Sequence, residues 1–256
     1  MKIASWNVNS LKVRLPQVLD WLEHQRPNVL GLQETKLTDD KFPADAFREL
    51  GYQVSFSGQP TYNGVALISG GEQTELVRSI PDFEDEQKRV IAATINGVRV
   101  VNLYVVNGQE VGSEKFAYKL AWLEAVTRWI EQERSRNDRL VVMGDFNIAP
   151  DDRDVYDPAA WHEKILCSTP EREALQRLLD LGLHDSFRLF DQAEAVFSWW
   201  DYRAAMFRRG LGLRIDLVLC SDALKAACTT SYVDKEPRRL ERPSDHAPAV
   251  AEFDLG

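Results

Sequence analysis

The chain has only three cysteines in 256 residues, too few for a fold that is stapled by disulfides. Cys167, Cys220 and Cys228 are odd in number and lack metal-type spacing, a pattern typical of proteins from a reducing compartment. Apolar runs are also short, because none approaches the roughly 20 residues that a membrane-spanning helix needs. No apolar signal region precedes the strand-like segment that begins at Met1-Lys2-Ile3. We therefore expect a soluble, cytoplasmic protein that has no membrane partner.

The sequence also lacks the Gly-, Ser- or Pro-rich stretch that would separate two domains, and it contains no short repeat. A length of 256 residues permits either two small domains or one large one. Apolar residues make up 44% of the chain and aromatic residues 10%, enough to fill one large core. We expect a single domain over residues 1–256.

The chain has fewer basic than acidic residues, 31 against 40, so its formal net charge is -9 at pH 7. This charge argues against a nucleic-acid partner, since phosphate binding normally needs a basic surface. Local patches decide contact, however, and basic residues gather in two short stretches. These are Arg203, Arg208, Arg209 and Arg214 in one, and Lys235, Arg238, Arg239 and Arg242 in the other. Charge alone leaves both solvated basic loops and a nucleic-acid surface open.

Strand-like and helical patterns share the chain. Apolar and β-branched runs predict strands over 2–9, 29–34, 52–57, 64–69, 90–95, 98–106, 140–147, 214–220 and 248–254. Apolar residues at helical spacing predict helices over Leu11–Gln25, Glu114–Arg136 and Glu171–Leu181. Asn96-Gly97 between two strand-like runs indicates a hairpin. Hairpins combined with a few long helices predict packed sheets with helices outside them.

One predicted strand ends on polar residues, because Gly144-Asp145-Phe146-Asn147 follows the apolar run 140–143. Side chains alternate along a strand, so Asp145 and Asn147 share the face that this run buries. A simple turn is the alternative, since Gly, Asp and Asn all favour turns. We favour a strand that carries a carboxylate and a carboxamide to the edge of the core, because other strands end in the same way.

Polar side chains mark five further strand ends. They are Asn7 and Asn9 in 2–9, Glu34 on the face of Leu30 and Leu32, Tyr104 in 98–106, Asp216 in an apolar run, and Asp245-His246 before 248–254. Each alone has an ordinary explanation as a cap, a surface turn, an ion pair or a core residue. Together they are hard to explain in that way, because burying each one costs desolvation free energy.

The chemistry of this set favours a divalent cation. Carboxylates with neutral amides are hard oxygen donors, which suit Mg²⁺, with Mn²⁺ as a substitute. Zinc is disfavoured, because the sequence has no cluster of Cys and His ligands. One histidine beside the acids could stabilise a developing negative charge or relay a proton. A hydrated Mg²⁺ with an adjacent base is typical of enzymes that hydrolyse phosphate esters.

The chain resembles the endonuclease/exonuclease/phosphatase superfamily, and within it the exonuclease III and abasic-site endonuclease branch of DNA-repair nucleases. The resemblance covers nearly the whole chain and rests on eight motifs in order. They are 5–10 (SWNVNS), 32–36 (LQETK), 64–66 (GVA), 103–104 (LY), 144–147 (GDFN), 197–203 (FSWWDYR), 213–216 (LRID) and 244–248 (SDHAP). The resemblance implies an α/β fold, a four-layer α/β/β/α sandwich of two packed mixed sheets with outer helices, and a monomer.

The resemblance also implies a metal site and a catalytic set. The implied metal site consists of Asn7, Glu34, Asp145, Asn147 and Asp245, with Glu34 and Asp245 as the principal ligands. The implied catalytic residues are Tyr104, Asp145, Asn147, Asp216 and His246. Asp145 would orient or deprotonate the attacking water, and His246 would contact the scissile phosphate with Asp216 as its partner. Tyr104 would either donate a hydrogen bond to the phosphate or act as the activating phenolate.

DNA contacts are implied in the same way. The matching residues are Asn9, Lys115, Trp199, Arg203, Leu213 and His246. Trp199 with Leu213 would form the pocket for a flipped abasic sugar or a terminal nucleotide, and Arg203 would probe the duplex beside it. The resemblance assigns no residues in the 151–167 loop, where a bulky side chain, Trp161 or His162, could restrict an internal abasic nucleotide. A solvent-facing loop is the alternative.

We therefore expect a Mg²⁺-dependent DNA-repair hydrolase of the exonuclease III type. Its partner would be double-stranded DNA with abasic sites, nicks or blocked 3′ ends. Its activities would be drawn from 3′-to-5′ exonuclease, 3′-phosphatase or phosphodiesterase, and cleavage 5′ to abasic sites. Two alternatives stay open: the same chemistry on a non-DNA phosphoester, and a non-catalytic nucleic-acid-binding regulator. The sequence does not fix the balance among the activities, or whether one or two metal ions act.

Overall fold

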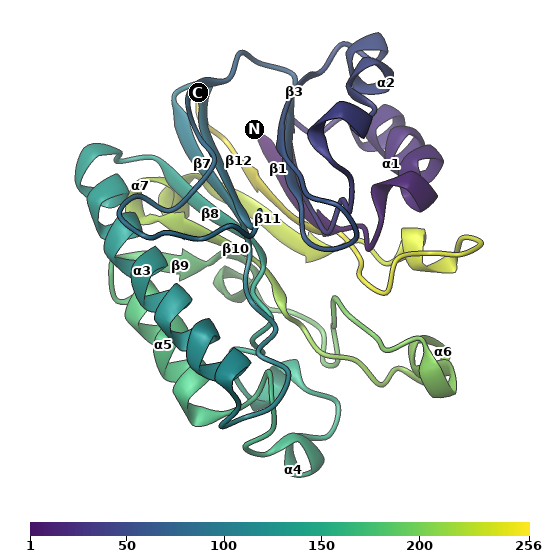
Figure 1. Ribbon diagram of the computed structural model, residues 1–256, viewed down its shortest axis with the longest axis vertical. Coiled ribbons are helices and arrows are strands. Elements are labelled where there is room, and N and C mark those ends of the chain that lie inside the picture. The colour runs from purple at the N-terminus through teal and green to yellow at the C-terminus, as the bar shows by residue number, and fades with distance from the viewer.

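Two six-stranded sheets pack face to face with helices on their outer faces in the computed structural model, which describes residues 1–256 (Figure 1). The strand orders are β11-β12-β1-β2-β4-β3 and β5-β6-β7-β8-β10-β9. Both sheets are mixed, because β1 pairs with β2 and β7 with β8 in parallel while the other pairs are antiparallel. The predicted α/β sandwich of two packed mixed sheets is confirmed.

The first sheet consists of β1 (Lys2–Asn7), β2 (Val29–Gln33), β3 (Gln53–Ser57), β4 (Val65–Ser69), β11 (Cys228–Val233) and β12 (Ala249–Phe253). The second consists of β5 (Thr74–Val77), β6 (Val90–Ile95), β7 (Val98–Tyr104), β8 (Leu140–Asp145), β9 (Leu183–Asp185) and β10 (Asp216–Ser221). The α-helices are α1 (Leu11–Gln25), α2 (Ala44–Glu49), α3 (Glu114–Arg136), α4 (Pro158–Trp161), α5 (Thr169–Leu179), α6 (Met206–Arg209) and α7 (Asp222–Ala227). Short 3₁₀ helices are η1 (Asp39–Lys41), η2 (Asp152–Asp154), η3 (Ser186–Leu189), η4 (Arg203–Ala205) and η5 (Glu236–Arg239).

The long helices form where the sequence predicts them. α1 and α3 have the predicted bounds, and α5 begins two residues earlier than predicted. Its start is fixed by a capping box, in which the Glu171 carboxylate accepts hydrogen bonds from the backbone N–H and the hydroxyl of Ser168. The helices therefore follow from local sequence signals.

Three strands, β5, β9 and β11, were not predicted. Each lies at the edge of its sheet, and each has three to six residues, of which at most one is buried. An edge strand buries less side-chain surface, so it lacks the apolar alternation that identifies a central strand. The missed strands complete the sheets but do not alter the predicted architecture.

The apolar residues divide into three main layers. One core lies between the sheets, a second under α1 and a third under α3 and α5 (Figure 1). A polar contact crosses the layer between the sheets, where the buried Asn102 of β7 donates to the carbonyl oxygens of Leu32 (2.9 Å) and Ala66 (3.0 Å). Asn102 also accepts a 2.6 Å hydrogen bond from Gln33. The contact fixes how the two sheets sit on each other.

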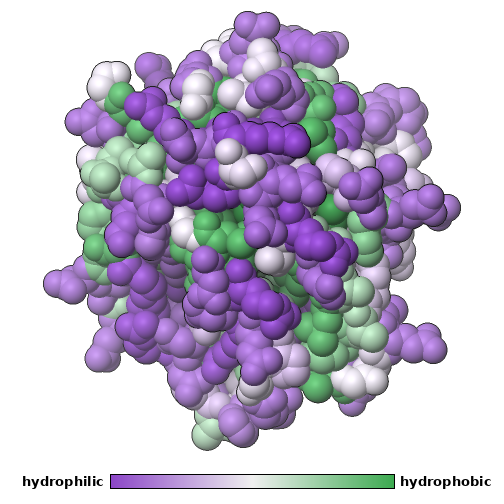
Figure 2. Space-filling view, turned by 90° about the vertical axis from the view of Figure 1, so that its left-hand side faces the viewer, coloured by the Kyte–Doolittle hydropathy of each residue, from purple (hydrophilic) through white to green (hydrophobic).

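The surface over the outer helices is mostly polar. Figure 2 shows the side that α3 and α5 cover, with hydrophobic residues in separate groups among hydrophilic ones. No helix is long and apolar enough to cross a membrane.

Candidate active site

The ends of the central strands bring the predicted polar residues to one edge of the sandwich. Asn7 ends β1 and Glu34 follows β2, and these strands are parallel in the first sheet. Tyr104 ends β7 and Asp145 ends β8, which are parallel in the second sheet. Asp216 begins β10 opposite Asp145, because β10 runs antiparallel to β8. Both sheets thus supply side chains to one site.

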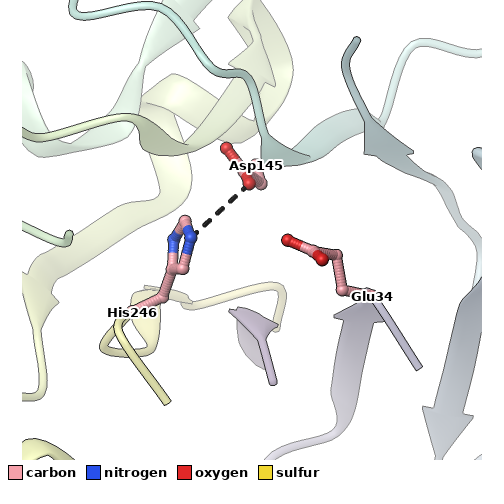
Figure 3. Close-up of side chains that lie close together, drawn as sticks. All are labelled: Glu34, Asp145 and His246. Carbon is pink, nitrogen blue, oxygen red and sulfur yellow. Dashed lines mark ion pairs between the residues drawn. The ribbon is translucent and has the colours of Figure 1, made fainter. Parts of the chain in front are cut away.

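A single amide joins the acids of the two sheets. Asn7 donates through Nδ2 to Glu34 Oε1 at 2.9 Å and to Asp145 Oδ2 at 2.8 Å. Ligand atoms of Glu34, Asp145 and His246 all lie within 4.8 Å of one another, and Figure 3 shows these side chains converging. The Asn7 oxygen accepts instead from the backbone N–H of Asn9. Asn7 therefore positions two carboxylates that share one small space.

Glu34 reaches this site by a route that strand alternation does not predict. Leu30 and Leu32 lie in the core under α1, not on the side of Asn7. The backbone turns at Glu34, which has a left-handed φ of 52°, and the turn directs the carboxylate toward Asn7. The prediction that Glu34 shares the face of the two leucines was wrong, although its place in the site was right.

Asp145 and Asn147 lie on a close approach of two strands. Gly144 has a φ of 152°, and a Cβ there would lie 1.9 Å from the Leu103 carbonyl oxygen of β7. The backbone then turns at Asn147, with a φ of 48°, so that its N–H donates to Asp145 Oδ1 at 2.9 Å. The motif is thus both a strand end and a turn, with both polar side chains at the site.

His246 forms an ion pair that is almost fully shielded from water. Its Nδ1 lies 2.9 Å from Asp216 Oδ2, and its Nε2 lies 3.7 Å from Asp145 Oδ2 (Figure 3). Burial alone would lower the pKa of His246, but Asp216 and Asp145 outweigh it and raise the pKa to about 10. Burial raises the pKa of Asp145, and the His246 charge opposes that rise. The histidine is therefore an imidazolium at neutral pH.

Tyr104 is a phenol at neutral pH in this arrangement. Burial and the nearby carboxylates of Glu34 and Asp145 raise the pKa of Tyr104 well above its usual value. Arg89 lies over the ring, 4.7 Å from its centroid, and opposes that rise only in part. A neutral phenol can donate a hydrogen bond, as the first of the two predicted roles of Tyr104 requires.

Lys119 was missed by sequence reasoning, and it holds the backbone beneath the site. It is fully buried in α3, forms an ion pair with Glu171 of α5, and donates to the carbonyl oxygens of Asn147 (2.7 Å) and Asn107 (3.1 Å). Asn107 in turn donates from its side chain to Asn147 Oδ1 at 3.2 Å. A lysine three residues after Phe116, on the apolar stripe of a predicted helix, was the available signal.

Asp245 lies beside the converging acids but outside the 4.8 Å group. Its Oδ1 accepts from Asn9 Nδ2 and its Oδ2 from Trp199 Nε1, both at 3.0 Å. Trp199 also pairs through its backbone with the buried Leu213, and both belong to one apolar cluster. The predicted Trp199–Leu213 pocket and the predicted ligand Asp245 are therefore neighbours.

The remaining predicted DNA-contact residues are exposed. Arg203 forms an ion pair with Asp201, with 87% of its side chain accessible. Lys115 lines a cleft of about 730 Å³ that also contains Tyr104 and Asn107. In the 151–167 loop, Trp161 is half-buried against Tyr156 and His162 is exposed. Their positions on the accessible surface are compatible with contact to a large substrate.

Comparisons with known proteins extend over the whole chain. The model of the endonuclease/exonuclease/phosphatase family matches residues 4–246. Exodeoxyribonuclease III of Haemophilus influenzae is 39% identical, with 99% of this chain and 100% of the relative covered. A 3′ phosphatase from Neisseria, solved with a product DNA hairpin, is 54% identical with a TM-score of 0.98, and both chains are fully covered. An AP endonuclease from Archaeoglobus fulgidus is 38% identical with a TM-score of 0.96, again over both full chains.

Proposed function

Because the chain belongs to the endonuclease/exonuclease/phosphatase family, we propose that it is a Mg²⁺-dependent DNA-repair nuclease of the exonuclease III type. The observation that carries the proposal is the Asn7 amide, which holds Glu34 and Asp145 together beside the His246–Asp216 pair. The carboxylates lie on one side of a small space, and the buried imidazolium of His246 lies on the other. This arrangement suits the hydrolysis of a phosphate ester.

The donor set fits a hard divalent cation. The convergence of Glu34 and Asp145 would be costly for two unscreened carboxylates, and their oxygen atoms are the kind that Mg²⁺ or Mn²⁺ prefers. We infer that Glu34 and Asp145 hold the ion, with Asp245 and Asn147 beside it. A bound ion would neutralise phosphate charge and acidify a water molecule. The buried imidazolium of His246 is a donor and not a ligand.

The protein groups have complementary roles in this proposal. His246 donates from Nε2 to a non-bridging phosphate oxygen, while Asp216 fixes the ring through Nδ1. Asp145 accepts a proton from the attacking water or orients it, and Asn147 holds that water. The side chain of Asn147 is itself held by the Val105 carbonyl oxygen (2.9 Å) and by Asn107. Because these groups are fixed beforehand, little reorganisation accompanies the reaction.

We propose double-stranded DNA with abasic sites, nicks or blocked 3′ ends as the substrate. The relatives support this choice, since they include a 3′ phosphatase bound to a product DNA hairpin and an AP endonuclease. The Trp199–Leu213 pair would receive the terminal nucleotide or abasic sugar, and Asn9, Lys115 and Arg203 would contact the surrounding DNA. A monomeric state, a single domain and a cytoplasmic location stay predictions.

The test compares cleavage of three duplexes: one with a 3′-phosphate at a nick, one with a 3′-hydroxyl end and one with an internal abasic site. We expect Mg²⁺-dependent cleavage of at least one duplex and its loss in EDTA. Asp145→Asn should lower kcat by roughly a thousandfold, because it removes the group that activates water. The exposed Asp20→Asn is the control and should leave kcat unchanged. Cleavage that persists in EDTA or in Asp145→Asn would contradict the proposal.

A further inference from the structure

The two basic stretches of the sequence lie side by side in the structure. A pocket of about 460 Å³ is lined by Arg208 of the first stretch, on α6, and by Lys235, Arg238 and Arg239 of the second, at η5. Figure 1 shows α6 and the yellow segment before β12 on the same side of the molecule. Four of the nine lining residues are basic, namely Arg208, Lys235, Arg238 and Arg239, and none is acidic. Arg214 is not among them, because it is buried in ion pairs with Asp154 (2.6 Å) and Asp185 (2.7 Å).

Arg238 is held in place within this pocket by contacts with both of the segments that line it. It is only 6% exposed, and its Nη1 donates to the Ser244 carbonyl oxygen. Its guanidinium lies 4.7 Å from the Phe207 ring centroid and 5.7 Å from that of Trp200. Cation–π contacts of this kind tie η5 to the α6 loop. Arg238 Nε is buried without a hydrogen-bond partner, so one donor of this guanidinium is unsatisfied within the protein.

The positive charge of the pocket is largely uncompensated. Arg239 forms an exposed ion pair with Glu236 at 3.2 Å, but Arg208, Lys235 and Arg238 form no ion pair with an acid. In a chain of net charge -9, such a concentration of basic groups is local and distinct. Arg guanidinium groups match the geometry of phosphate oxygens, so the pocket suits a phosphate anion.

The pocket adjoins the proposed active site along the chain. Trp199 donates to the Asp245 side chain, and the next residue, Trp200, lines the pocket and donates from its backbone to the Asp245 carbonyl oxygen at 3.0 Å. Neighbouring Cα atoms are about 3.8 Å apart, so the two sites share a wall. Asp245 thus contacts both sites, because its side chain accepts from Trp199 and its carbonyl oxygen accepts from Trp200.

We propose that the pocket of Arg208, Lys235, Arg238 and Arg239 binds a backbone phosphate of the substrate duplex, beside the nucleotide that is cleaved. This inference rests on the proposed function and deepens it, since it names the second point at which the protein contacts DNA. The pocket would also give a chain of net charge -9 a local point of attraction for a polyanion.

The test removes two charges from the pocket without touching its buried residue. Arg208→Gln/Lys235→Gln is compared with Arg136→Gln/Lys225→Gln, which removes the same two charges from α3 and α7. All four residues are exposed, so each variant should fold. The dissociation constant for a nicked duplex is measured by fluorescence anisotropy in EDTA at several salt concentrations. Each phosphate contact contributes about 0.9 to the slope of log affinity against log salt.

We expect the slope of the pocket variant to fall by about one and its dissociation constant to rise about tenfold, with no such change in the control. An equal fall in both variants, or none in either, would overturn the proposal. A second measurement follows the thermal stability of both proteins as inorganic phosphate is added. It distinguishes a DNA backbone phosphate from a free phosphate ion as the bound anion. If phosphate stabilises the wild type but not the pocket variant while the DNA slopes agree, the pocket holds a free anion and the proposal is wrong. If the wild type cleaves no DNA, the proposed function itself is wrong. If it cleaves DNA normally but the salt slopes of the pocket and control variants are equal, only the proposal about the pocket is wrong.

Discussion

At the scale of the residue, Asp216 contributes most to the charge of His246, ahead of Asp145. Asp216 accepts from its Nδ1 in a buried setting that would otherwise disfavour an imidazolium. Ser198 fixes Asp216 in turn, through a 2.6 Å hydrogen bond from its hydroxyl to the same carboxylate oxygen. Asp216 and Ser198 therefore form a hydrogen-bonded chain that maintains the His246 cation, with Asp216 Oδ2 accepting from both His246 and Ser198.

Asp216→Asn should make activity more sensitive to alkaline pH. The pKa of His246 is raised to about 10, so the imidazolium persists through neutral pH and is lost only as the pH rises through that value. Without the Asp216 charge, burial should move the pKa back toward the ordinary value of about 6.5, although Asp145 still opposes that fall. The alkaline limb of the kcat/KM profile should shift to lower pH by about one to three units.

The exposed pair of His184 and Asp222 supplies the control. Its atoms lie 2.7 Å apart, but it is not in the site, so Asp222→Asn should leave the kcat/KM profile unchanged. An alkaline limb that stays in place in Asp216→Asn would show that the His246 charge does not limit catalysis.

At the scale of the element, α3 and α5 meet through a buried charge pair. Glu171 accepts from the backbone N–H groups of Leu166 (3.0 Å) and Ser168 (3.1 Å) while it pairs with Lys119. Lys119 reaches across to the Asn147 turn. One ion pair thus links the start of α5, the body of α3 and the end of β8.

Glu171→Gln should lower the free energy of unfolding by about 3 kcal/mol, because it leaves the buried Lys119 charge without a counterion. Glu124→Gln is the matched control on α3, since it breaks an exposed pair with Arg128 and should cost less than about 1 kcal/mol. Urea denaturation measures both values. Equal costs would mean that Lys119 carries no buried charge in the variant, because it is either solvated or deprotonated.

At the scale of the whole molecule, the two sheets are joined by a buried amide as well as by apolar packing. Asn102 of the second sheet contacts three residues of the first, namely Leu32, Gln33 and Ala66. Polar contacts in a core restrict the arrangements that apolar side chains alone would allow. The hydrogen bonds of Asn102 therefore help to determine how the two sheets are positioned on each other.

Asn102→Leu should destabilise the protein by about 2 kcal/mol or more, because Gln33 and two carbonyl oxygens lose a buried partner. The control is Thr94→Val on β6, where the threonine hydroxyl bonds the exposed Glu75 and should matter little. Urea denaturation again gives the free energies. A stable Asn102→Leu variant with full activity would show that apolar packing alone sets the registry.

The sequence predicted the parts of this molecule that have strong local signals. Long helices, central strands and the polar residues at strand ends were identified, because burial imposes clear periodicity on them. The edge strands β5, β9 and β11 were not, since they have little buried surface. The face of Glu34 was wrong because a left-handed backbone turn replaced strand alternation. Lys119 was missed because its partners, Glu171 and the Asn147 carbonyl, are distant in sequence.

The division of the site between the sheets bears on how activity appears during folding. Asn7 and Glu34 come from the first sheet, whereas Asp145 and Asp216 come from the second. Neither sheet alone contains all the residues of the site, and only docking of the two sheets brings the Asn7 amide to Asp145. Recovery of turnover in a refolding experiment should therefore coincide with sheet docking and lag behind the return of secondary structure. The reaction of the enzyme therefore reports when the two sheets have docked.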